Sequence, residues 1–68
     1  MNLQRQHDIN EAVQAYIDGG YKLLGLTVHA IVEARGLVRW EARVFAQQIR
    51  GSVYETLGVH IQRDARYR

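Results

Sequence analysis

The chain contains no cysteine and no proline among its 68 residues. The lack of cysteine excludes disulfide cross-links and a cysteine nucleophile, and no cluster of metal-ligating side chains is visible in their place. A chain of this length buries only about 60% of the surface that its unfolded form exposes, so a single core is marginal. We therefore expect oligomerisation or close helix packing to supply the missing stability.

Long hydrophobic runs are also absent. The longest, from Leu23 to Val32, is interrupted by Thr27 and His29 and is too short to cross a bilayer. The first eight residues are polar and lack the apolar segment of a signal peptide. Because a protein without cysteine is compatible with a reducing compartment, we expect a cytoplasmic protein that has no membrane partner.

Positive charge is scarce in the first half of the chain and concentrated in the second. Residues 1–34 carry two basic and four acidic side chains, whereas residues 35–68 carry seven arginines and three acidic side chains. The formal net charge is +2, and eight of the nine basic residues are arginine. The planar guanidinium group suits carboxylate, phosphate and aromatic partners.

A first helical pattern begins near residue 9. Asp8, followed by Glu11, fits the N-cap of this helix and its acidic partner. Gly36 fits a left-handed C-cap with Leu37 as its apolar contact, so the helix is expected to end at Arg35. The apolar side chains that recur at helical spacing are Ile9, Val13, Ile17, Leu24, Val28 and Ile31.

The pair Gly19-Gly20 interrupts this pattern. Each glycine costs about 1 kcal/mol relative to alanine inside a helix. Two alternatives remain open: one long helix from residue 8 to residue 35, or a first helix that ends at this pair and a second that begins near Tyr21.

A second helix is predicted over residues 39–57. It ends at Leu57-Gly58, which repeats the signal of the first helix. The short connection makes the two helices antiparallel neighbours or a helix-turn-helix corner. A competing interpretation pairs residues 24–30 and 38–44 as strands, but the helical stripe is longer than the strand-like alternation. The members of this stripe are Val38, Ala42, Phe45, Ile49, Val53 and Leu57.

The segment 21–34 is apolar around most of its circumference, and only Lys22, His29 and Glu33 form a polar strip. Such a helix needs cover on most sides, and one partner helix covers one side only. We therefore expect an all-α helical hairpin that forms a four-helix-type homodimer, with residues 1–61 as a single domain and residues 62–68 as a polar basic tail. In the alternative, a separate helix over residues 8–18 folds back and covers the segment within one chain.

The second helix carries a further face opposite its apolar stripe, with Gly51 at its middle. Tryptophan, tyrosine and arginine are the residue types enriched among binding hot spots. The alternatives are a homodimer contact and scattered exposed side chains without a role. The residues predicted to bind a partner are Arg39, Trp40, Arg43, Val44, Arg50 and Tyr54.

Few features point to catalysis. Ser52 has no spacing that suggests a triad, His29 and Glu33 at i, i+4 supply only two metal ligands, and the glycines match no phosphate-binding motif. We expect no enzyme activity, cofactor or metal.

Nucleic-acid binding is the alternative function. Residues 28–47 fit a helix-turn-helix frame with Gly36 in the turn, although Arg35 then stands at a usually apolar position. The side chains that would contact DNA or RNA are Arg39, Arg43, Arg63, Arg66 and Arg68. The favoured prediction is a small regulatory or inhibitory protein, of the kind that phages and other mobile elements encode, that binds a larger protein stoichiometrically.

Overall fold

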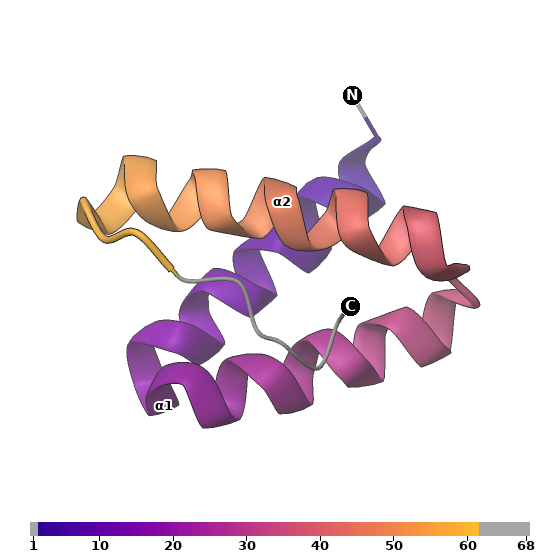
Figure 1. The fold of residues 1–68 in the computed structure, drawn as a ribbon, viewed down its shortest axis with the longest axis horizontal. Helices are drawn as coiled ribbons and strands as arrows, with labels where there is room; N and C mark the ends of the chain where they lie inside the picture. The colour runs from indigo at the N-terminus through magenta and orange to yellow at the C-terminus, as the bar shows by residue number, and fades with distance from the viewer. Residues whose placement is uncertain (1, 62–68) are drawn as a thin grey trace.

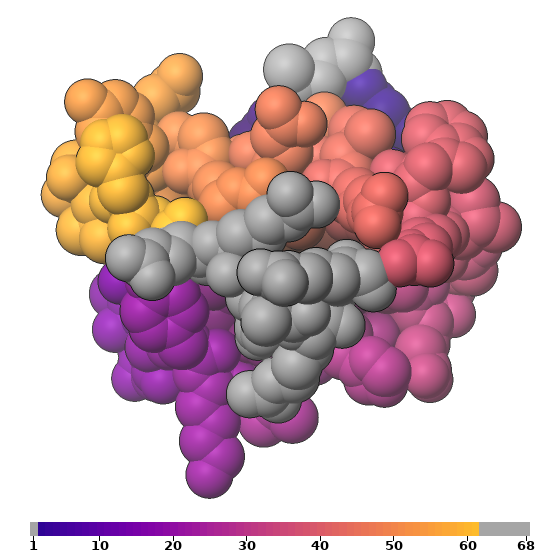
Figure 2. Space-filling model, in the orientation of Figure 1, coloured from indigo at the N-terminus to yellow at the C-terminus, as the bar shows by residue number. Residues whose placement is uncertain are grey.

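The computed structural model describes residues 2–61, which form two helices, α1 (Leu3–Arg35) and α2 (Arg39–Leu57). Figure 1 shows that α1 runs down from the N-terminus, turns sharply and runs back below α2, and that α2 then returns across the top of the molecule. Figure 2 shows that α2 and the part of α1 after the turn both reach the molecular surface on this side. The predicted all-α helical hairpin is confirmed. Residues 24–30 and 39–44 of the competing strand interpretation are helical, and Val38 is the N-cap of α2.

The bend in α1 lies at Gly20, whose backbone has φ 67° and ψ −154°. Side chains with a Cβ atom rarely adopt this conformation, whereas glycine reaches it readily. The alternative left open by the sequence is thereby resolved: α1 consists of a first half (residues 3–19) and a second half (residues 21–35) joined at an angle.

The C-terminal ends of both helices lie where the sequence predicts them. Gly36 is left-handed with φ 64°, and the amide of Leu37 donates to the carbonyl of Val32 at 3.0 Å. Leu37 packs against the core, as expected for the apolar contact of this cap. Gly58 is also left-handed, with φ 69°, and its amide donates to the carbonyl of Tyr54.

The predicted start of α1 at Asp8 is wrong. The helix begins at Leu3, and Asn2 is its N-cap, with a side-chain oxygen that accepts from the amide of Gln4 at 2.9 Å. Asp8 lies inside the helix and is only 2% exposed. Its carboxylate instead binds Arg35 at the C-terminal end of α1.

The core lies where the two halves of α1 and the buried side of α2 meet. The centres of both predicted stripes are buried, whereas their outlying members Ile17, Val38 and Leu57 are exposed near the bend and at the ends of α2. The first half of α1 covers the second half within one chain, as the alternative to the dimer requires, but on one side only. The buried members of the core are Ile9, Ala12, Val13, Leu24, Val28, Ile31, Phe45, Ile49 and Val53.

Candidate partner-binding surfaces

The outward face of α2 carries all six side chains that the sequence assigns to a partner site. Trp40 is 67% exposed and Tyr54 is 50% exposed, because Phe45, Ile49 and Val53 occupy the opposite, buried side of the helix. We call this surface the Trp/Arg face; Arg50 in it is half-buried and the other members are exposed. Its members are Arg39, Trp40, Arg43, Val44, Arg50 and Tyr54.

The arginines of the Trp/Arg face have no partner in the part of the chain that the structure describes. Within residues 2–61, Arg39, Arg43 and Arg50 form no hydrogen bond or ion pair with another described residue. Arg5 on α1 differs, because its guanidinium donates to Gln48 at 2.8 Å and lies over the ring of Phe45. The guanidinium groups of the Trp/Arg face therefore remain available to an external acceptor.

The aromatic part of this face is partly ordered by its neighbours. The ring of Tyr54 stacks on His60, with centroids 4.3 Å apart and an interplanar angle of 30°.

Gly51 is exposed in the same helix, and a Cβ atom built on it meets nothing within 4 Å. Within residues 2–61, nothing in the packing therefore requires glycine at this position.

A bidentate ion pair between Asp8 and Arg35 closes the bent α1. Arg35 Nε donates to Asp8 Oδ2 and Nη2 donates to Asp8 Oδ1, each at 3.0 Å, and Gln4 donates to the same carboxylate at 3.1 Å. The hydrogen bond from Arg35 lowers the pKa of Asp8 below its ordinary value, against the opposing effect of burial. The pair holds the first turns of α1 against its last residue, 27 positions later.

Sequence reasoning missed this ion pair. Arg35 continues the row Leu24, Val28, Ile31 at helical spacing, and Asp8 directly precedes Ile9 in the first half of α1. The signal for this ion pair is an acidic residue at the edge of one apolar stripe and a basic residue at the edge of the other. The helix-turn-helix frame treated Arg35 only as a misfit.

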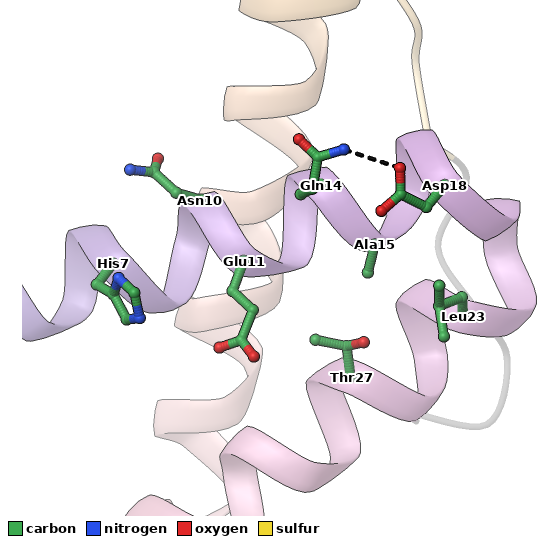
Figure 3. A pocket seen from close by; sticks show the side chains of 8 residues that line it. All are labelled: His7, Asn10, Glu11, Gln14, Ala15, Asp18, Leu23 and Thr27. Atoms are coloured by element: carbon green, nitrogen blue, oxygen red, sulfur yellow. Dashed lines mark hydrogen bonds between the residues drawn. The ribbon is translucent and has the colours of Figure 1, made fainter.

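A groove runs between the two halves of α1. It consists of two adjoining hollows that share Glu11 and Thr27, and the larger has a volume of about 530 Å³. Figure 3 shows Glu11 pointing toward Thr27 across the groove, with Asp18 near the bend and α2 behind the first half of α1. One wall is polar and the other apolar. The second half of α1 lines the groove with Leu23, Leu26, Thr27, Ala30, Ile31, Ala34 and Arg35.

The two acidic side chains of the polar wall differ in their contacts. Asp18 accepts a hydrogen bond from Gln14 at 2.8 Å, drawn as the dashed line in Figure 3. Glu11 forms no hydrogen bond or ion pair in the part of the chain that the structure describes. Its negative charge acts on Arg35, which lines the same groove, from beyond ion-pair distance.

The remaining sequence predictions concern charged residues elsewhere. His29 and Glu33 lie 3.1 Å apart and both are 71% exposed, which is a solvated pair on one helical face. Among residues 2–61, no group of three or more metal-ligating side chains occurs, and no helix has the length and hydropathy needed to cross a membrane. Arg63, Arg66 and Arg68 lie outside the described residues.

The corner proposed for nucleic-acid binding has the short turn that its frame requires. The second half of α1 and α2 nevertheless run in roughly opposite directions in Figure 1, whereas the helices of a helix-turn-helix motif cross at about 90–120°.

Comparisons of the chain with protein-family models, with curated proteins and with solved structures find no match.

Proposed function

We propose that this chain is a non-catalytic regulatory or inhibitory protein that binds a larger protein stoichiometrically through the Trp/Arg face. The observation that carries the proposal is the exposure of Trp40 beside Arg39 and Arg43, neither of which has a partner among the described residues. A large exposed aromatic side chain beside free arginines has the composition of a binding hot spot.

The chemistry of this face defines the partner. Trp40, Val44 and Tyr54 offer apolar area that a hydrophobic depression on the partner would cover. Arg39 and Arg43 offer forked donors that pair with carboxylates in bidentate geometry. The partner therefore presents an apolar depression bordered by aspartate or glutamate side chains.

The chain acts as a homodimer in this proposal. One copy covers Leu24, Val28 and Ile31 but leaves Leu23 and Leu26 of the same helix exposed. A domain of this size gains stability from burying such surface against a second copy. The four-helix-type dimer remains our proposal for how the exposed side of α1 is covered.

Removing the anchors of the Trp/Arg face is expected to abolish partner capture. The double variant Trp40→Ala/Arg43→Ala deletes one apolar anchor and one guanidinium group. Both side chains are exposed, so the helix content and the oligomeric mass in solution should stay unchanged. Capture is measured by pull-down from a nuclease-treated lysate at physiological salt, followed by circular dichroism and light scattering of the variant. Leu3→Ala, at a position 86% exposed on α1, is the matched control and should retain capture. If the double variant unfolds or dissociates to a monomer, the Trp/Arg face supports the fold or the dimer and is not the partner site.

Nucleic acid is the second candidate ligand, because unpaired Arg39 and Arg43 also suit phosphate groups. The two candidates differ in their response to salt. Binding to phosphates releases counterions, so it falls by orders of magnitude between about 50 and 200 mM salt when several phosphates are contacted. Capture that survives nuclease and moderate salt supports the protein partner, and capture that disappears with nuclease supports nucleic acid.

Gly51 provides an independent test of close contact at this face. Gly51→Ala should stabilise α2 by about 1 kcal/mol, because alanine favours the helix and its Cβ meets open space. The same Cβ should weaken partner capture if the partner surface approaches the backbone there. Gly25→Ala, which also places a Cβ in open space, should stabilise α1 and leave capture intact. Unchanged capture by the Gly51 variant would remove this position from the contact.

A further inference from the structure

The second half of α1 bears an exposed apolar strip along the groove, which we call the α1 strip. Leu26 in it is 61% exposed, although Val28 and Ile31 nearby belong to the core. The strip therefore lies away from the core, and the first half of α1 covers only part of Leu23, which is 38% exposed. Its members are Leu23, Leu26, Ala30 and Ala34.

The side-chain sizes along this strip are complementary to those of a reversed copy. The two leucines stand near the bend, and the two alanines stand near the turn to α2. An antiparallel copy sets Leu26 against Ala30 and Leu23 against Ala34, so each large side chain meets a small one. We propose that a second copy of this chain docks on the α1 strip, antiparallel and about a two-fold axis. This inference rests on the homodimer of the proposed function and names the contact that forms it.

The charges beside the strip support the same arrangement. On its solvent side, Lys22 lies near the bend and Glu33 lies near the turn; on its groove side, Asp18 lies near the bend and Arg35 near the turn. A two-fold axis across antiparallel helices places each side beside the same side of the other copy in reverse order. Lys22 then approaches Glu33 of the partner subunit, so that opposite charges meet on the solvent side of the strip. On the groove side, Arg35 is already paired with Asp8 of its own chain.

Glu11 is the group that distinguishes a second copy from other occupants. It lines both hollows at the middle of the groove, and its carboxylate forms no hydrogen bond or ion pair within residues 2–61. Arg35 of the same chain feels its charge from beyond ion-pair distance. Two-fold docking brings the two Glu11 carboxylates toward each other near the axis, where like charges repel. The variant Glu11→Gln should therefore tighten the dimer, whereas a cationic segment in the same groove would bind the variant more weakly.

Docking through the α1 strip leaves the Trp/Arg face free. In Figure 3 the groove faces the viewer, and α2 lies behind the first half of α1. The dimer consequently carries two Trp/Arg faces, one on each copy, and it binds its larger partner with a stoichiometry of two to two.

Sedimentation equilibrium of paired substitutions tests this register. Leu26→Ala sets alanine against alanine and Ala30→Leu sets leucine against leucine, so each should raise the dimer dissociation constant about tenfold or more. The double variant Leu26→Ala/Ala30→Leu restores a large side chain against a small one and should return to within about threefold of the wild type. Lys22→Glu and Glu33→Lys should follow the same pattern at low salt: each alone weakens the dimer and the pair together restores it.

The controls separate this contact from the fold and from the proposed function. Leu26, Ala30, Lys22 and Glu33 are exposed, so circular dichroism of each variant should match the wild type at concentrations where it is folded. The melting temperature should fall with the affinity of the dimer and recover in the double variants. Double variants that do not recover, or a Glu11→Gln variant that dissociates more readily, would overturn the register. A wild-type dimer that none of these substitutions affects would place the interface elsewhere and leave the homodimer standing. A monomeric wild type would remove both, while partner capture through Trp40 is judged by its own assay.

Discussion

Replacing Gly20 with alanine is expected to disrupt the bent α1 and, with it, the hydrophobic core. Gly20 holds φ 67° and ψ −154°, and an alanine forced into such a region is strained by about 1–3 kcal/mol. Alanine also favours a continuous helix over glycine by about 1 kcal/mol. Both effects favour a straight α1, in which Ile9 and Val13 can no longer pack against Val28.

The expected result for Gly20→Ala is high helix content without cooperative unfolding. A small domain has only a few kcal/mol of stability to lose, so a change of this size removes most of the folded population. Circular dichroism reports the helix content and urea titration reports cooperativity. Gly25→Ala is the matched control, since its Cβ meets open space in a regular helix and should raise the melting temperature. A Gly20 variant as stable as the wild type would show that the bend does not depend on glycine.

Breaking the ion pair between Asp8 and Arg35 should have the second large effect. Arg35→Met keeps much of the apolar stem but leaves the buried Asp8 carboxylate with Gln4 as its remaining side-chain donor. The variant leaves the buried charge of Asp8 without its cation, so it should lower the free energy of unfolding by much more than the loss of an exposed pair does. His29→Ala breaks a pair whose two members are 71% exposed and should cost less than about 0.5 kcal/mol.

The same ion pair predicts a dependence of stability on pH. Arg35 holds the pKa of Asp8 below its ordinary value in the folded chain. A carboxyl group with a lowered pKa contributes stability above the pKa of its unfolded form, about 3.9, and that stability is lost as pH falls through the lower folded value. The wild type should therefore lose unfolding free energy below about pH 4. In urea titrations between pH 7 and pH 3, the difference in unfolding free energy between the wild type and Asp8→Asn should shrink as the pH falls below about 4, and a difference that stays constant would contradict this role.

Local signals in the sequence predicted the C-terminal helix ends correctly. Gly36 and Gly58 end their helices in the left-handed conformation, and α2 spans the predicted residues. These ends depend on one glycine and the few residues before it, so no tertiary information is needed. The bend at Gly20 was left open, because glycine tolerates both a helical and a positive φ and only the packing of the two halves decides between them.

The predicted start of α1 was wrong because Asp8 contacts a residue far along the chain. Asp8 resembles an N-cap locally, but both oxygens of its carboxylate accept hydrogen bonds from Arg35. Asn2 caps the helix instead. A contact between residues 27 positions apart is set by the bend, which the periodicity of the sequence does not fix. The groove was missed for the same reason, because its walls come from the two halves of α1.

The Trp/Arg face was accessible to sequence reasoning because it belongs to one regular helix. Once the stripe containing Phe45 and Ile49 is assigned to the core, the spacing of 100° per residue places Trp40 and Tyr54 on the outer side. What this face binds depends on a surface that belongs to another molecule, so its identity stays a proposal.

The mass of the native protein in solution tests the account most directly. One copy leaves Leu26 and its neighbours on α1 uncovered, and our account assigns their cover to a second copy. Light scattering across a micromolar concentration series should therefore give twice the chain mass of 7.9 kDa. A cooperatively folded species that keeps the mass of a single chain throughout that series would contradict it.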